Sequence, residues 1–374
     1  MAGDRLSSVD NLRTLMVAWV IGAHSLAGYT VVGGWPYDEV NEVTVAPGVE
    51  VALTVVVGQS GLFVIGAFFF VAGLFTPESL RRKGRPEFLR DRVVRLGLPW
   101  VVSALVLWPL SLWVAYRAAG HDVTPWWVLT HRRPFLDSGA LWFALVLLVF
   151  SVGYVMWPGR GLSRARRPTT GYLLLVAAGV AMASFLVRLW FPARSGQPGD
   201  LHLWQWPQCL GLFALGIAVS RHGWGRRVPD RQYRVSGGIA VGTMVLLPLL
   251  ALRLGMTDAV DGVGPFLGGW HWQALLAASV EGVLVVFGSV FLLGLAQRSW
   301  VWAGSLATGC ARVAFTAFVL QGPVLVLLAV ALRPLAAPAE VKAVLLVAGA
   351  ITGCFSLAWL LARSRVRGLT VRLS

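Results

Sequence analysis

The chain has 374 residues, of which 57% are hydrophobic and only 13% are charged, and its mean hydropathy is +0.70. These values exclude a soluble globular protein of ordinary composition and indicate a membrane protein. The net charge of +15 would suggest a nucleic-acid partner in a soluble protein, but the arginines are sorted by loop, so we expect no nucleic acid.

Apolar stretches that could cross the hydrocarbon layer as helices recur along the whole chain. We therefore expect an all-α, polytopic membrane protein with about ten transmembrane helices, in a single domain over residues 1–374. The predicted spans are 12–33, 50–75, 96–116, 139–157, 171–192, 203–220, 235–252, 271–296, 312–332 and 342–362.

Positive charge alternates between the connections that join these spans. By the positive-inside rule, the arginine-rich side is cytoplasmic, and both termini are predicted to lie on that side. Arg132 and Arg133 are the exception, because they fall on the outer side. The arginine-rich side holds Arg81, Arg82, Lys83, Arg85, Arg90, Arg92, Arg95, Arg160, Arg164, Arg166, Arg167, Arg221, Arg226, Arg227, Arg231, Arg234, Arg363, Arg365, Arg367 and Arg372. The outer side holds the acids Asp38, Glu39, Glu42, Asp258 and Asp261.

The first span carries two ionisable residues, Arg13 and His24, eleven positions apart. Eleven helical steps of about 100° place both side chains on one face, separated by about 16 Å of rise. An ionisable group in hydrocarbon costs about 2.5–3.5 kcal/mol or more, so such groups usually mark a functional path. Two structural alternatives remain open: His24 could bond a neighbouring helix, and Arg13 could reach to lipid headgroups.

A strongly basic connection precedes the third span. Residues 76–95 contain seven cations, which suits a loop that binds lipid headgroups. The alternative is an anion site, because Arg92 and Arg95 stand three apart on one helical face and arginine forks match phosphate oxygens.

Glu281 is the other ionisable residue predicted to lie deep in the membrane. It follows Trp270 by eleven residues, which places it about 16 Å from the outer surface and close to the expected level of His24. A carboxylate there could orient the imidazole of His24 or raise its basicity. Pairing with Arg188 or Arg312 for structural reasons is the alternative.

Tryptophans alternate with polar residues at two outer helix ends, around Trp204 and Trp272. These rings could stack on sugar rings, which would favour a carbohydrate acceptor. Tryptophan belts also line most membrane interfaces, so an anchoring role is the alternative.

The three cysteines, Cys209, Cys310 and Cys354, lie within or beside apolar spans. Their positions have neither metal-ligand spacing nor the pattern of a disulfide framework. We interpret them as packing residues and expect no metal cofactor.

Four motifs in order resemble those of the membrane acyltransferase 3 family. They are Val9-Asp10-Asn11-Leu12-Arg13 followed by His24, then Phe68 to Phe75, the basic stretch Phe88 to Pro99, and Leu141-Trp142-Phe143. The resemblance covers the first 150 residues well and the rest mainly by helix count. The Asp-Asn-Leu-Arg motif is also similar to that of the branch that includes periplasmic-glucan succinyltransferase-like proteins.

The resemblance implies an O-acyltransferase whose donor is a cytoplasmic acyl-CoA, with acetyl-CoA as the first candidate. The acceptor would be a hydroxyl of a sugar, glycan, lipid or natural product. His24 would be the catalytic histidine, with Arg13, Arg92 and Arg95 at the donor. Trp142 would contact substrate. Gln321 stands where many members carry a histidine, and its amide could hold a substrate.

Acyl transfer to an alcohol needs a base, and histidine is the usual base at neutral pH. We therefore expect His24 to be the general base in an integral protein of the bacterial cytoplasmic membrane, in contact with membrane lipids. A covalent acyl-histidine is an alternative mechanism. The main alternative function is a transporter or flippase, although the internal repeats and matched broken helices typical of many carriers are not evident; a catalytically idle scaffold is a third possibility.

Overall fold

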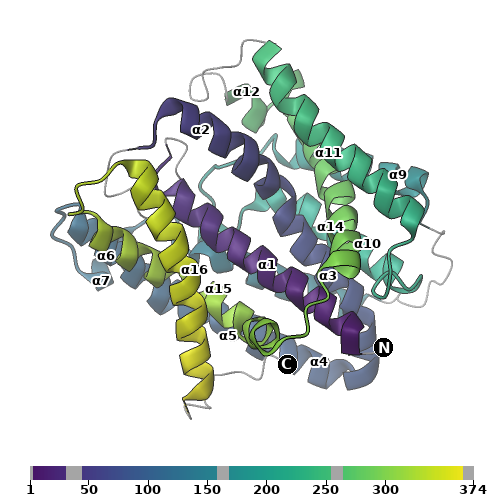
Figure 1. The fold of residues 1–374 in the computed structure, drawn as a ribbon, viewed down its shortest axis with the longest axis horizontal. Coiled ribbons are helices and arrows are strands. Elements are labelled where there is room, and N and C mark those ends of the chain that lie inside the picture. Colours follow the sequence, from purple (N-terminus) through teal and green to yellow (C-terminus); the bar gives the residue numbers. More distant parts are fainter. Residues whose placement is uncertain (1–2, 31–43, 158–167, 254–263, 365–374) are drawn as a thin grey trace.

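The computed structural model describes residues 3–30, 44–157, 168–253 and 264–364. Helices dominate these residues, and no β-strand occurs among them (Figure 1). The predicted all-α class is therefore confirmed. The acids Asp38, Glu39, Glu42, Asp258 and Asp261, like Arg160, Arg164, Arg166, Arg167, Arg365, Arg367 and Arg372, lie outside the described residues.

Three long helices are built from shorter α segments joined by π-helical turns. They are Pro47–Lys83 with α2 (Pro47–Leu53) and α3 (Gln59–Lys83), Arg85–Ala118 with α4 (Arg85–Arg92), α5 (Leu98–Val102) and α6 (Trp108–Ala118), and Trp272–Ser299 with α13 (Trp272–Val283) and α14 (Ser289–Ser299). The other helices are α1 (Gly3–Ala27), α7 (Pro125–His131), α8 (Trp142–Met156), α9 (Thr170–Val187), α10 (Trp206–Ser220), α11 (Asp230–Arg253), α12 (Gly264–Leu267), α15 (Ser305–Leu332) and α16 (Ala339–Arg363).

Within the described ranges, 7 helices are long and apolar enough to cross a membrane. The helices α1, α10 and α11 are not among them. Polar residues such as Asp10, Arg13 and His24 lower the hydropathy of α1, while α10 has only 15 residues. The chain is therefore a polytopic membrane protein, whereas the count of ten spans and the cytoplasmic termini stay predictions.

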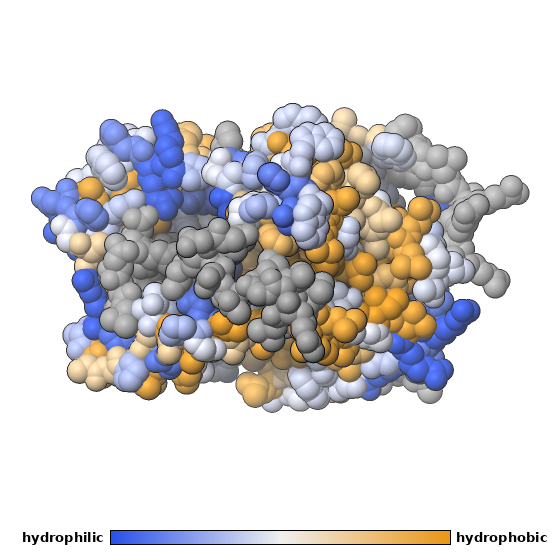
Figure 2. Space-filling model, turned by 90° about the horizontal axis from the view of Figure 1, so that it is seen from above, coloured by the Kyte–Doolittle hydropathy of each residue, from blue (hydrophilic) through white to orange (hydrophobic). Residues whose placement is uncertain are grey.

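Large apolar side chains cover much of the outside of the helix bundle. Figure 2 shows a broad hydrophobic area on one face, bordered by hydrophilic residues. Such an area exceeds what a soluble monomer usually exposes, and it suits contact with lipid. Examples of exposed apolar residues from different helices are Leu175, Leu246, Leu306 and Val344.

The first helix lies in the middle of the bundle, where α1 packs against α15, α16 and α14 (Figure 1). Its start is held by Asn11, whose amide donates to the backbone carbonyls of Trp300 and Trp302 at 2.8 and 3.0 Å. These carbonyls belong to the segment just before α15, and His24, further along α1, bonds Gln321, further along α15, so the two helices run in the same direction. His24 of α1 can therefore reach a residue of α15.

Two glycines allow α3 and α10 to cross closely. A Cβ atom on Gly73 would lie 2.1 Å from the carbonyl oxygen of Phe213, and one on Gly216 would lie 2.2 Å from that of Phe70. Neither contact is possible for a larger residue. Small residues at helix crossings in membranes have this use, because they let the backbones approach.

The basic connection of residues 76–95 is almost wholly helical. The helix Pro47–Lys83 ends at Lys83, Gly84 adopts a φ of 76°, and the next helix begins at Arg85. Glycine suits this left-handed position after a helix, and Pro86 suits the first turn of the next one. The connection is therefore a tight helical corner, and Arg92 and Arg95 lie on a helix, as the anion-site alternative assumed.

Candidate functional site

A cavity with a volume of about 260 Å³ opens between α1, α3, α8, α15 and the helix Arg85–Ala118. Arg13, Arg92 and Arg95 all line it, and one carboxylate, that of Asp10, faces them. The three arginines predicted to contact the donor therefore share one site, which we call the basic cavity. The rest of its lining is apolar, with the aromatic residues Phe68, Phe75, Phe143, Phe315 and Phe318.

Contacts within α1 and with neighbouring helices hold the guanidinium groups of Arg13 and Arg92. Arg13 lies 3.7 Å from the Asp10 carboxylate and 5.5 Å from the ring centroid of Phe75. Arg92 donates to the hydroxyl of Thr76 at 3.5 Å. The Nε atom of Arg92 is buried without a hydrogen-bond partner among the residues described, which leaves a donor for an anion.

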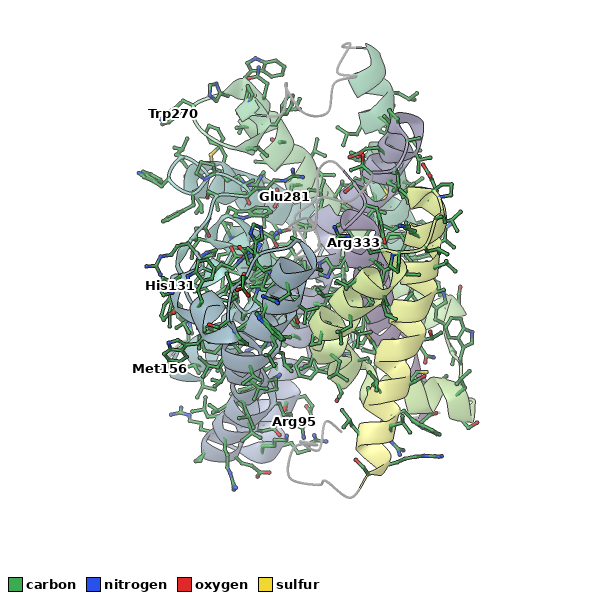
Figure 3. All side chains as sticks on the ribbon, turned by 90° about the vertical axis from the view of Figure 1, so that its left-hand side faces the viewer. Arg95, His131, Met156, Trp270, Glu281 and Arg333 are labelled. Atoms are coloured by element: carbon green, nitrogen blue, oxygen red, sulfur yellow. The ribbon has the colours of Figure 1, made fainter. Side chains whose placement is uncertain are left out.

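Arg95 is positioned by an ion pair on its own helix. Its Nε atom lies 2.7 Å from the carboxylate of Asp91, which also pairs with Lys83 at 2.9 Å. Figure 3 shows Arg95 at the opposite end of the molecule from Trp270. The basic cavity therefore lies toward one end of the bundle.

His24 and Gln321 form a hydrogen bond between α1 and α15. The distance from His24 Nδ1 to Gln321 Oε1 is 3.0 Å. An amide oxygen can only accept, so Nδ1 carries the proton of the neutral ring, and its lone pair is on Nε2. Gln321 is buried, and its Nε2 atom has no hydrogen-bond partner within the described residues. The pair thus combines an oriented base with an amide donor.

The basic cavity and this pair occupy successive levels of the same two helices. Val17 lines the cavity, and His24 follows it by seven residues, or about 10 Å of helical rise. On α15, Phe318 lines the cavity and Gln321 follows one turn later. Phe318 and Gln321 also share the wall of a small hollow of about 10 Å³.

Glu281 does not take the orienting role expected of it beside His24. Its carboxylate forms a buried ion pair with Arg188, at the end of α9, and the two side chains are 1% and 4% exposed. This is the structural alternative that the sequence left open. Gln321 is the residue that the structure gives His24 as a partner.

The tryptophans predicted to bind substrate lie in different surroundings. Trp142 is buried and stacks on His202, with ring centroids 4.7 Å apart. Trp204 lies under the guanidinium of Arg188, 5.2 Å from its ring centroid. Trp272 begins α13 and is 66% exposed. Trp142 and Trp204 flank the same ring, because His202 also lies 6.0 Å from Trp204, whereas Trp272 is on another helix. Their contact with a substrate stays a prediction.

The family model described as "Acyltransferase domain" matches residues 6–363, nearly the whole chain. The chain belongs to the membrane acyltransferase 3 family. No curated protein and no solved structure matches it. The protein is thus a membrane acyltransferase, which disfavours the transporter alternative.

The sequence alone did not identify several residues of this candidate site. Asp10 had a visible signal, because it precedes Arg13 by three residues on the same helical face. Thr76 and Phe318 had no such signal, because the residues that they contact belong to other helices. His202 lies two residues before Trp204 in the sequence, but its stacking on Trp142 comes from tertiary structure.

Proposed function

We propose that this acyltransferase moves an acyl group from acyl-CoA to the hydroxyl of an acceptor, with His24 as the general base. One observation carries the proposal. The same two helices, α1 and α15, line an arginine-rich cavity and, further along, hold His24 and Gln321 in a hydrogen bond. The arginines that would bind the phosphates of the donor and the base that would act at its acyl end then lie at two levels of the same helices.

The basic cavity suits the donor in both charge and polarity. Coenzyme A carries phosphate groups at one end and a long flexible arm that ends in the thioester. Arginine forks bind phosphate oxygens through paired hydrogen bonds, and Arg13, Arg92 and Arg95 outnumber Asp10 and Asp91, the acids that pair with them. The aromatic lining suits the arm and an acetyl group, because neither brings a charge.

The proposed reaction uses both members of the polar pair. His24 Nε2 takes the proton of the acceptor hydroxyl as its oxygen attacks the thioester carbonyl carbon. The Nε2 amide group of Gln321 then donates to the developing oxyanion, as donors in an oxyanion hole do. When the carbon–sulfur bond breaks, the imidazolium returns its proton to the leaving thiolate. In the alternative, the acyl group passes through His24 itself.

The finer parts of the proposal rest on the family. The donor is acyl-CoA on the cytoplasmic side of a bacterial cytoplasmic membrane, with acetyl-CoA first and succinyl-CoA second. The acceptor is a glycan, a lipid or a natural product that reaches His24 from the other side. Membrane lipids surround the protein, and both termini are cytoplasmic.

A donor assay on the purified protein in lipid nanodiscs tests the proposal. We expect cleavage of acetyl- or succinyl-CoA labelled in the acyl group, and transfer of the label to glycan or lipid acceptors. Label that remains on His24 after rapid denaturation would replace direct transfer with the covalent route. Folded protein that neither binds nor cleaves any acyl-CoA would refute the proposed function.

A further inference from the structure

Two aromatic rings close the inner end of the basic cavity. Phe143 of α8 and Phe318 of α15 meet edge to face, with ring centroids 5.0 Å apart, and both are buried. Phe68 of α3 packs on Phe143 at 6.1 Å. Three helices therefore contribute to one aromatic wall, and edge-to-face packing is a favoured geometry that resists displacement.

One ring of this wall, that of Phe318, stands between the basic cavity and Gln321. Phe318 lines the basic cavity on one side and, with Gln321, a hollow of about 10 Å³ on the other. A hollow of that size is about as large as one water molecule. An acyl group that reaches Gln321 from the cavity must therefore pass Phe318 and fit into a very small space.

The side chains around the small hollow limit how far this hollow can widen. Trp108 also lines the small hollow, and a Cβ atom on Gly322 would already lie 3.2 Å from its ring. Extra methylenes forced into a packed interior cost energy, because neighbouring side chains must leave their preferred rotamers. A short acyl chain needs only a small shift of Phe318, whereas a long one needs the wall to open.

We propose that Phe143 and Phe318 determine donor specificity by admitting short acyl groups to His24 and excluding long ones. This inference rests on the proposed function, since it assumes an acyl-CoA in the basic cavity. The wall acts after the coenzyme A moiety has bound. It therefore selects between thioesters that make the same contacts through the coenzyme A moiety and differ only in the acyl chain.

The test compares cleavage of acetyl-, butyryl- and octanoyl-CoA, measured as release of free coenzyme A with water as the acceptor. We expect the unmodified protein to prefer acetyl-CoA over octanoyl-CoA. Phe318→Leu and Phe143→Leu should each reduce this preference by about tenfold, the discrimination that a pocket gains from one methylene. Phe318→Ala should reduce it further. Binding of coenzyme A alone should not change.

Phe150→Leu is the matched control. Phe150 is a buried ring on α8 that packs against Phe69 and does not line the basic cavity. Its replacement should leave the chain-length preference as it was. The leucine variants keep an apolar side chain, so they decide the question even if Phe318→Ala fails to fold.

Two results would overturn the inference. The first is an unchanged preference in folded Phe318→Leu and Phe143→Leu, and the second is an equal shift in Phe150→Leu. Folded, unmodified protein that cleaves no acyl-CoA of any length would instead refute the proposed function, and this inference with it.

Discussion

Two polar pairs join helices inside the apolar bundle, and they differ in charge and in surroundings. Arg188 and Glu281 carry opposite charges and are almost completely buried. His24 and Gln321 form a neutral pair, and His24 is half-buried, about two helical turns beyond Val17, which lines the basic cavity. Each pair leaves buried polar atoms without a hydrogen-bond partner in the described part of the chain, namely Arg188 Nε and Glu281 Oε1 in the first and Gln321 Nε2 in the second, so the two pairs differ in charge rather than in the number of bonds made.

This difference separates a structural pair from a reactive one. An ion pair in a low-dielectric interior stabilises a structure mainly because losing one partner strands the other charge. A neutral histidine held by an amide strands no charge in its resting state, and its free ring nitrogen is the atom that can take a proton during a reaction. Breaking the ion pair should therefore lower stability more than turnover, whereas breaking the His24–Gln321 pair should lower turnover more than stability.

The largest expected effect is that of His24→Ala on turnover. A positioned base contributes about 10²–10⁴-fold, so the rate of acyl transfer should fall by that order while donor affinity is kept. The thermal unfolding midpoint should change little, because the substitution strands no charge. The exposed His271 gives the control His271→Ala, which should retain its rate. A folded His24→Ala protein with a near-normal rate would remove His24 from the mechanism.

Glu281→Ala should act on stability instead. Removal of one partner of a buried ion pair costs about 3–5 kcal/mol, so the free energy of unfolding in detergent should fall by that amount. The double variant Arg188→Met with Glu281→Leu should recover most of the loss, because neither charge is then stranded. Activity per folded molecule should persist. A Glu281→Gln variant of normal stability but without activity would restore the catalytic role first expected for this residue.

The arginines of the basic cavity should determine donor affinity. Arg92→Ala combined with Arg95→Ala removes two charged donors, and each hydrogen bond to a charged group is worth about 1.5–3 kcal/mol, so acetyl-CoA affinity should fall at least about tenfold. The loss should shrink at high salt, because screening already weakens the wild-type contact. Arg90→Ala, an exposed neighbour outside the cavity, is the control. Unchanged donor affinity in calorimetry would contradict the donor site.

Gln321→Leu should have a smaller effect than His24→Ala. It removes the hydrogen bond that orients His24, and a neutral hydrogen bond is worth about 0.5–1.5 kcal/mol, so turnover should fall by up to about tenfold. A loss of an oxyanion donor would add to this. Gln321→Asn, which keeps the amide on a shorter chain, should retain donor binding. Normal turnover in Gln321→Leu would show that His24 needs no orienting partner.

The smallest effect is expected for Trp272→Ala. This ring is 66% exposed at the start of α13, and substitutions at such surface positions usually change stability by no more than about 0.5 kcal/mol. Acetyl-CoA cleavage should be unaffected. Weaker binding of a glycan acceptor at unchanged donor cleavage would support the substrate role predicted for this tryptophan.

The sequence by itself determined the class of fold and the residues worth testing. Long apolar stretches report helices in a membrane, because a backbone in hydrocarbon must satisfy its own hydrogen bonds. Ionisable residues within such stretches stand out, and the helical period places Arg13 and His24 on one face. The order of the motifs pointed to the family that the domain model identifies.

Tertiary structure alone decided which of these residues meet. Gln321 lies 297 positions from His24, and Glu281 lies 93 from Arg188, so no local period relates them. Phe143 and Phe318 likewise form one wall only because α8 and α15 pack together. The physical reason is that helical periodicity determines which face a side chain occupies, while the partner of that face depends on how helices far apart in the chain pack together.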